Sequence, residues 1–237
     1  MILNWNTQNG AGEIPPFYCV IDVETADPTP EDLLIEKRYM KNGRLKDPEK
    51  IREKQEAIRG GLTDSAPIFC IGTKTPEKLA VFSWGKLSRD DETLLMSQGI
   101  LGVTARNEVE MLLMFAAYLQ SLPEQTRLIT SNGEHFDIPK LKFRYAKHDL
   151  PIPTQLFQNK HSDLMRVFSF FSVSGVPFFS VEEMAAKLGI PFYKVLSGAQ
   201  VPEFVRDGKH ADVILYNALD CVTEELIAKR LLRGKIL

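Results

Sequence analysis

The stretch YCVIDVETADP, residues 18–28, begins as an apolar strand and then carries two carboxylates one residue apart, Asp22 and Glu24. Because side chains alternate across a β-strand, Val20, Asp22 and Glu24 face one way, and Ile21 and its neighbours face the other. Two anions held this close repel each other unless a cation compensates, and hard divalent ions such as Mg²⁺ prefer oxygen ligands. The stretch therefore indicates a metal site at a strand end, although a solvated strand end would give the same pattern.

Composition limits the classes of protein that fit this chain. Its 237 residues, 44% of them hydrophobic, suffice for one large domain or two small ones with a substantial core. No run of about 18 apolar residues occurs, so we expect no membrane span, and the first residues do not resemble a secretory signal. The three cysteines lie far apart in apolar surroundings, which is typical of buried thiols in a reducing compartment. We therefore expect a cytoplasmic protein.

The charge distribution bears on nucleic-acid binding. A net charge of -2 argues against a protein that coats nucleic acid through bulk positive charge, but it allows an enzyme with a local contact surface. One basic surplus lies at 37–59, inside a charged insertion that we place at 36–61. This segment fits a solvated helix face as well as a surface that contacts phosphates.

Apolar patterning predicts alternating strands and helices without internal repeats. The predicted strands are residues 17–23, 68–73, 79–84 and 128–130, of which the second and third form a hairpin. The predicted helices are residues 48–58, with Asp47 as N-cap, and 107–122, 138–146, 181–188 and 209–232. This order predicts a single α/β domain with a mixed central sheet flanked by helices.

Two later segments carry further acidic residues. In TSNGEHFDIPKL, residues 130–141, a strand runs into Asn132 and Gly133, and Asp137 lies at the start of the next helix, where it also fits a simple N-cap. In the last helix Tyr216 and Asp220 are four residues apart beside an apolar face, close enough to share one reacting atom. A tyrosine packed at the helix edge beside an exposed aspartate would give the same pattern.

The order of these segments resembles the DEDD superfamily of 3′-to-5′ exonucleases, which is built on the RNase H-like fold. In that family an Asp-x-Glu motif ends the first strand, a second aspartate opens a helix, and the last aspartate lies on a C-terminal helix. The matching residues here are Asp22, Glu24, Asp137 and Asp220. A tyrosine four residues before the last aspartate, here Tyr216, is typical of the DEDDy (DnaQ-like) branch.

Longer segments are similar to the proofreading exonuclease domain of family B DNA polymerases, and most closely to stand-alone bacterial proteins related to it. These segments are NGEHFDIPKLKFRYAKHDLPIP, HSDLM, SVEEMAAKLGIP and YNALDCVTEELIAKRL. The resemblance covers about 17–232, so we expect one exonuclease domain over 1–237. Asp163, within HSDLM, fits a supporting or structural role and is not counted as a ligand.

The resemblance implies a chemistry for these residues. The four carboxylates would hold two divalent cations, Mg²⁺ or Mn²⁺, and an activated water would cleave the terminal phosphodiester bond to release nucleoside 5′-monophosphates. Tyr216 would orient this water, since a phenol with a pKa near 10 is a poor base at neutral pH. Asn132 would bind the terminal nucleotide and Phe136 would stack on its base, although Phe136 also suits ordinary core packing.

Three functions follow from this interpretation. The expected substrate is the 3′ end of single-stranded DNA, with a DNA polymerase or repair protein as a partner and no membrane. An exoribonuclease on the same fold would differ in how its site treats the 2′-hydroxyl. A catalytically silent nucleic-acid-binding or polymerase-associated subunit is the third alternative, and loss of one of the five site residues would have favoured it.

Overall fold

The computed structural model describes residues 17–34, 46–59, 66–157, 160–170, 179–192 and 195–233. Residues 36–45 and 60–61 of the expected charged insertion lie outside these ranges, as does the part of the basic segment that precedes residue 46. The described part of the insertion is mainly the helix α2 (Pro48–Arg59), which begins as predicted after Asp47. The Asp47 carboxylate accepts a hydrogen bond from the Glu49 amide at 2.9 Å, which confirms the predicted cap.

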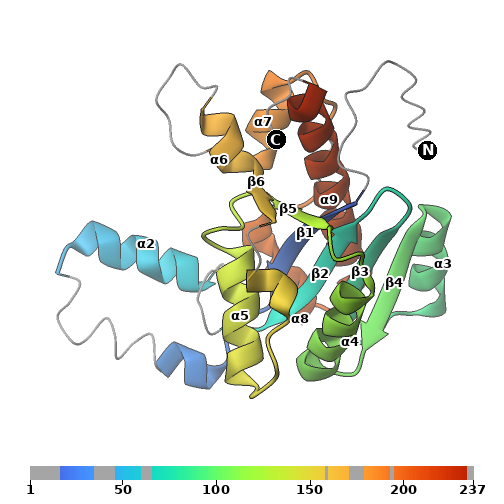
Figure 1. The fold of residues 1–237 in the computed structure, drawn as a ribbon. Helices are drawn as coiled ribbons and strands as arrows, with labels where there is room; N and C mark the ends of the chain where they lie inside the picture. The colour runs from blue at the N-terminus through green and yellow to red at the C-terminus, as the bar shows by residue number, and fades with distance from the viewer. Residues whose placement is uncertain are drawn as a thin grey trace.

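Within the described residues, six strands form one mixed sheet at the centre of the molecule (Figure 1). In sheet order the strands are β4 (Ile100–Ala105), β3 (Leu79–Trp84), β2 (Ile68–Lys74), β1 (Tyr18–Thr25), β5 (Arg127–Thr130) and β6 (His161–Asp163). β2 pairs antiparallel with both β1 and β3, so the predicted hairpin is confirmed. β4 runs parallel to β3, and β5 and β6 continue parallel to β1. The predicted mixed sheet in a single α/β domain is confirmed.

Helices cover both faces of this sheet. α4 (Glu108–Ser121) and α5 (Asp137–Lys147) pack on one face, where Ile21 and Val23 of β1 point. The other face is covered by α9 (His210–Arg233), together with α3 (Arg89–Ser97), α6 (Leu164–Ser169), α7 (Val181–Lys187) and α8 (Val201–Arg206). In Figure 1 α4 and α5 lie in front of the sheet and α9 lies behind it. Since Val20 packs on the α9 side, the predicted alternation along β1 is confirmed.

The sequence patterns did not predict five elements that are short or exposed, namely β4, β6, α3, α6 and α8. β6 has three residues, and α6 and α8 have six each, too few for a period to be recognised. β4 is an edge strand whose middle residues are largely exposed, so it lacks an apolar signature. α3 begins at a capping box between Ser88 and Asp91, which is a local sequence signal for the start of this helix. None of the helices in the described ranges has the length and apolar character that a membrane span needs.

A buried ion-pair network joins α4, α5 and β2. The Glu108 carboxylate accepts hydrogen bonds from the Ile68 amide at 2.7 Å and from Arg144 Nε at 2.8 Å. It also contacts His148 Nε2 at 2.8 Å. Because Arg144 belongs to α5, the network holds this helix against the sheet. α5 carries Asp137 at its first residue, so the network also positions that carboxylate.

Candidate active site

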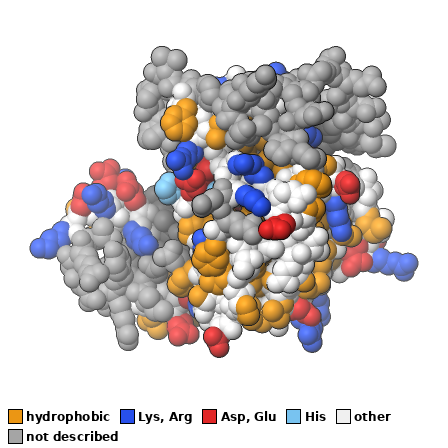
Figure 2. All heavy atoms as spheres, in the orientation of Figure 1, with side chains coloured by type: hydrophobic (Ala, Val, Ile, Leu, Met, Phe, Trp, Pro, Cys, Tyr) orange, Lys and Arg blue, Asp and Glu red, His pale blue; other side chains and the backbone are white. Residues whose placement is uncertain are grey.

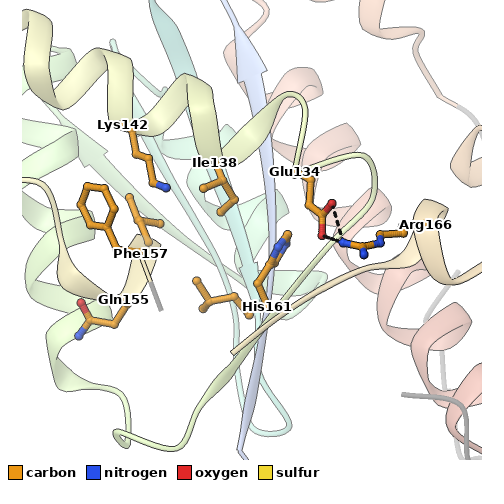
Figure 3. Close-up of a pocket in the computed structure, with 9 residues that line it drawn as sticks. Glu134, Ile138, Lys142, Gln155, Phe157, His161 and Arg166 are labelled. Carbon is orange, nitrogen blue, oxygen red and sulfur yellow. Dashed lines mark hydrogen bonds and ion pairs between the residues drawn. The ribbon is translucent and has the colours of Figure 1, made fainter. Parts of the chain in front are cut away.

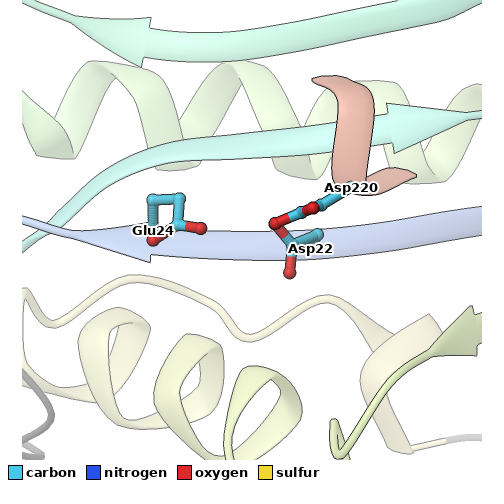
Figure 4. A group of neighbouring side chains, drawn as sticks. All are labelled: Asp22, Glu24 and Asp220. Atoms are coloured by element: carbon cyan, nitrogen blue, oxygen red, sulfur yellow. The ribbon is translucent and has the colours of Figure 1, made fainter. Parts of the chain in front are cut away.

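Three carboxylates meet where α9 crosses β1. Asp22 and Glu24 project from β1 on one side, and Asp220 projects from α9 toward them (Figure 4). One oxygen from each of Asp22, Glu24 and Asp220 lies within 4.8 Å of the other two. Asp220 is buried, whereas Asp22 and Glu24 are half-buried. Oxygen ligands gathered in this way are the donor set that Mg²⁺ and Mn²⁺ prefer, so these residues fit a divalent cation.

Asp137 approaches the same strand from the other side. Its side chain is 2% exposed, and Oδ1 accepts a hydrogen bond from the Val23 amide at 3.0 Å. The N-cap position of α5 is Phe136, so the alternative that Asp137 serves as a simple N-cap is wrong. Asp137 is not one of the three carboxylates within 4.8 Å of one another, but it is tied to β1 at the residue between Asp22 and Glu24.

Burial and mutual repulsion disfavour charge in this cluster. Burial raises the pKa of Asp22 well above its usual range, and the charges of Asp137 and Asp220 raise it further. Burial also raises the pKa of Glu24 well above its usual range, and the charges of Asp22, Asp220 and Asp137 raise it further. Burial also raises the pKa of Asp137 to about 7. A bound cation would offset the repulsion among the ionised carboxylates, so ionisation of this cluster and the binding of a cation favour each other.

Tyr216 lies next to these carboxylates on α9. Burial raises the pKa of its phenol above the ordinary value, and the charges of Glu24, Asp220 and Asp22 raise it further. The shift favours the protonated phenol, which can donate a hydrogen bond and orient a water.

Asn217 is a site residue that the sequence interpretation missed. It is 0% exposed, and Nδ2 donates hydrogen bonds to the Asp22 carboxylate at 2.7 Å and to the Asp22 carbonyl at 3.2 Å. The close approach requires Gly72, which pairs with Asp22 in the sheet: a Cβ there would lie 2.2 Å from Asn217 Oδ1. The position of Asn217 three residues before Asp220, on the same helix face, was a usable signal.

Comparison with known families agrees with this architecture. A family model described as "RNase_H superfamily" matches residues 72–232. The chain belongs to the RNase H superfamily. The matched residues include Asp137, Tyr216 and Asp220, whereas Asp22 and Glu24 precede them. No curated protein matches the chain. Because most members of the RNase H superfamily are metal-dependent nucleases, this membership supports a nuclease-type activity that uses divalent cations.

In this RNase H-like fold, Asp163 at the end of β6 organises the loop between β5 and α5. Its two carboxylate oxygens accept hydrogen bonds from the amides of Asn132 at 3.0 Å and Glu134 at 2.9 Å. It also caps α6 by accepting from the Met165 amide at 3.0 Å. Asp163 therefore has a structural role. Asn132 adopts a left-handed backbone with φ of 63°, and its buried Oδ1 has no partner among the described residues.

A hollow of about 530 Å³ opens beside this loop, between α5 and β6 (Figure 3). Its rim carries the ion pair of Arg166 and Glu134 at 2.9 Å. On the opposite side, Lys142 Nζ lies 4.4 Å from the ring centroid of Phe157, which is 59% exposed. Figure 2 shows basic side chains gathered near β5 and β6 in the same part of the surface. The hollow thus combines cationic and aromatic groups, and its lining includes Glu134 and Ile138, which lie two residues before and after the half-buried Phe136 in the sequence.

Proposed function

We propose that this protein is a 3′-to-5′ exonuclease of the DEDDy type that degrades single-stranded DNA from its 3′ end and releases nucleoside 5′-monophosphates. The observation that carries the proposal is the meeting of Asp22, Glu24 and Asp220 within 4.8 Å. Membership of the RNase H superfamily supports a nuclease. The exonuclease branch is favoured by Tyr216, which precedes the last aspartate by four residues and lies against the carboxylates.

Four carboxylates would hold the cations. Asp22, Glu24 and Asp220 fit one divalent ion, and Asp137 with Asp22 would hold a second. Bound Mg²⁺ or Mn²⁺ would supply Lewis-acid stabilisation of the attacking water and of the leaving 3′ oxygen. Tyr216 would hold the attacking water in line through its hydroxyl.

The loop between β5 and α5 is proposed to bind the strand. Asn132 would hydrogen-bond the terminal nucleotide, and Phe136 would stack on its base, at about 1 to 3 kcal/mol per stacked base. The hollow lined by Lys142, Phe157 and Arg166 extends from this loop and offers groups that suit phosphates and bases. A DNA polymerase or repair protein would be the partner that presents the 3′ end.

The proposal is tested by a time course on 5′-labelled single-stranded DNA and RNA of matched sequence, with Mg²⁺, Mn²⁺ or EDTA. We expect a metal-dependent ladder that shortens from the 3′ end of DNA. Asp22→Ala should abolish it, because the metal site loses its central ligand. Tyr216→Phe should slow it by about 10²-fold, because the water is less well oriented, and should leave measurable activity, because the cations still activate the water.

The opposite outcomes are equally informative. Similar residual activity in Asp22→Ala and Tyr216→Phe would contradict this division of roles. Degradation of RNA alone would identify the protein as an exoribonuclease. Intact substrate under every metal condition would favour the silent nucleic-acid-binding subunit.

A further inference from the structure

A further carboxylate, Glu224, is buried one helical turn beyond Asp220 on α9. Its side chain is 1% exposed, and Oε2 has no hydrogen-bond partner among the described residues. Because residues three and four apart share a helix face, Asn217, Asp220 and Glu224 follow one stripe of α9. Burying a carboxylate oxygen without a hydrogen-bond partner costs folding free energy, so we expect a water or a cation to bind this oxygen.

The adjacent glutamate is also buried, but other residues of the protein bind its carboxylate. Glu225 is 4% exposed and receives a hydrogen bond from the Tyr18 hydroxyl. Lys74 Nζ lies 3.2 Å from its Oε1, and Lys229 Nζ lies 3.0 Å from the same atom. Two neighbouring glutamates are thus buried to a similar degree, but the described residues supply cations to only one of them.

Glu224 is not one of the three carboxylates that lie within 4.8 Å of one another, and it is less exposed than Asp22. Glu224 is therefore a more deeply buried neighbour of the proposed ligands, one helical turn beyond Asp220 on the same stripe of α9.

We propose that Glu224 is a fifth carboxylate of the metal site, which acts on the divalent cations through a bound water and raises their affinity. The inference rests on the proposed function, because it assumes that the cluster of Asp22, Glu24, Asp137 and Asp220 holds cations. Loss of a residue that supports metal ligands from behind typically weakens metal affinity by about 10- to 100-fold. Glu224 is thus a positioning residue rather than a direct ligand.

The test is a calorimetric titration of the full chain with MnCl₂, without nucleic acid, near neutral pH. We expect Glu224→Gln to weaken Mn²⁺ binding by about 10- to 100-fold. Glu224→Asp, which keeps the charge, should retain most of the affinity. Glu225→Gln is the matched control, because it neutralises an equally buried glutamate that is paired elsewhere, and its Mn²⁺ affinity should equal that of the wild type.

Thermal unfolding in EDTA separates this role from a structural one. Glu224→Gln should melt at the same temperature as the wild type or higher, since the substitution removes an unpaired buried acid. Glu225→Gln should melt lower, because it removes the partner of Lys74 and Lys229. Unchanged Mn²⁺ affinity in Glu224→Gln, or a lower melting temperature in EDTA, would overturn the inference. The titration contains no nucleic acid, so failure of the exonuclease proposal would be seen separately, in the cleavage assay.

Discussion

Gly72→Ala tests whether the contact between β2 and α9 sets the geometry of the active site. The added Cβ would lie 2.2 Å from Asn217 Oδ1 and 2.6 Å from Cys221 Sγ, whereas ordinary contacts lie at 3.4–4 Å. The helix or its side chains must therefore move by about 1 Å. Overpacking of this kind costs about 1 to 3 kcal/mol of unfolding free energy. For a domain of this size, the melting temperature should fall by about 2 to 12 °C.

The same substitution should impair the site. Asn217 Nδ2 donates to the Asp22 carboxylate, so a displaced Asn217 no longer holds Asp22 in its orientation toward Glu24 and Asp220. A misplacement of about 1 Å can lower a rate by about 10²-fold. We therefore expect the removal of nucleotides from labelled single-stranded DNA to slow by about that factor, at temperatures where the variant remains folded.

Gly102→Ala provides the matched control. Gly102 also lies in a strand, β4, but a Cβ there would meet Leu95 Cδ1 at 3.7 Å, which is an ordinary contact. This variant should keep the wild-type rate, and its unfolding free energy should change by less than about 1 kcal/mol. If Gly72→Ala matched Gly102→Ala in both melting temperature and rate, the proposed coupling between the strand and the helix would be refuted.

Two further predictions concern stability. Because burial raises the pKa of Asp137 to about 7, the folded protein without metal binds a proton that the unfolded chain releases near pH 4. Its stability in EDTA should therefore be greatest at acid pH and fall as pH rises through about 7. The fall should be smaller in Asp137→Asn, which lacks the titrating carboxyl. A melting temperature that rises with pH in the wild type would contradict this prediction. Arg144→Leu leaves the buried Glu108 without its guanidinium partner and should cost about 3 to 5 kcal/mol in urea unfolding. Arg106→Leu, which removes an exposed ion pair, should cost less than about 1 kcal/mol, and equal losses in the two variants would contradict the role of the buried network.

Local patterns determined much of the fold. The two-residue period of a strand depends only on neighbouring residues, so it placed Ile21 and Val23 in the core and Asp22 and Glu24 on the opposite side. The spacing of Tyr216 and Asp220 likewise placed them on one face of the last helix. Turn residues and apolar runs were enough to predict the hairpin of β2 and β3. The short edge elements carried too few residues for any period to show.

Tertiary structure alone decided how these pieces meet. The 4.8 Å cluster depends on which sheet face α9 covers, and Asn217 reaches Asp22 only because the register of β1 against β2 places Gly72 opposite. The partner of Asp137, the Val23 amide, belongs to a strand far away in the sequence. The sequence by itself was enough to select Asp22, Glu24 and Asp220, which the structure brings together, because side-chain type and local period are properties of neighbouring positions. The contacts that orient those residues join distant segments, whose packing no local pattern encodes.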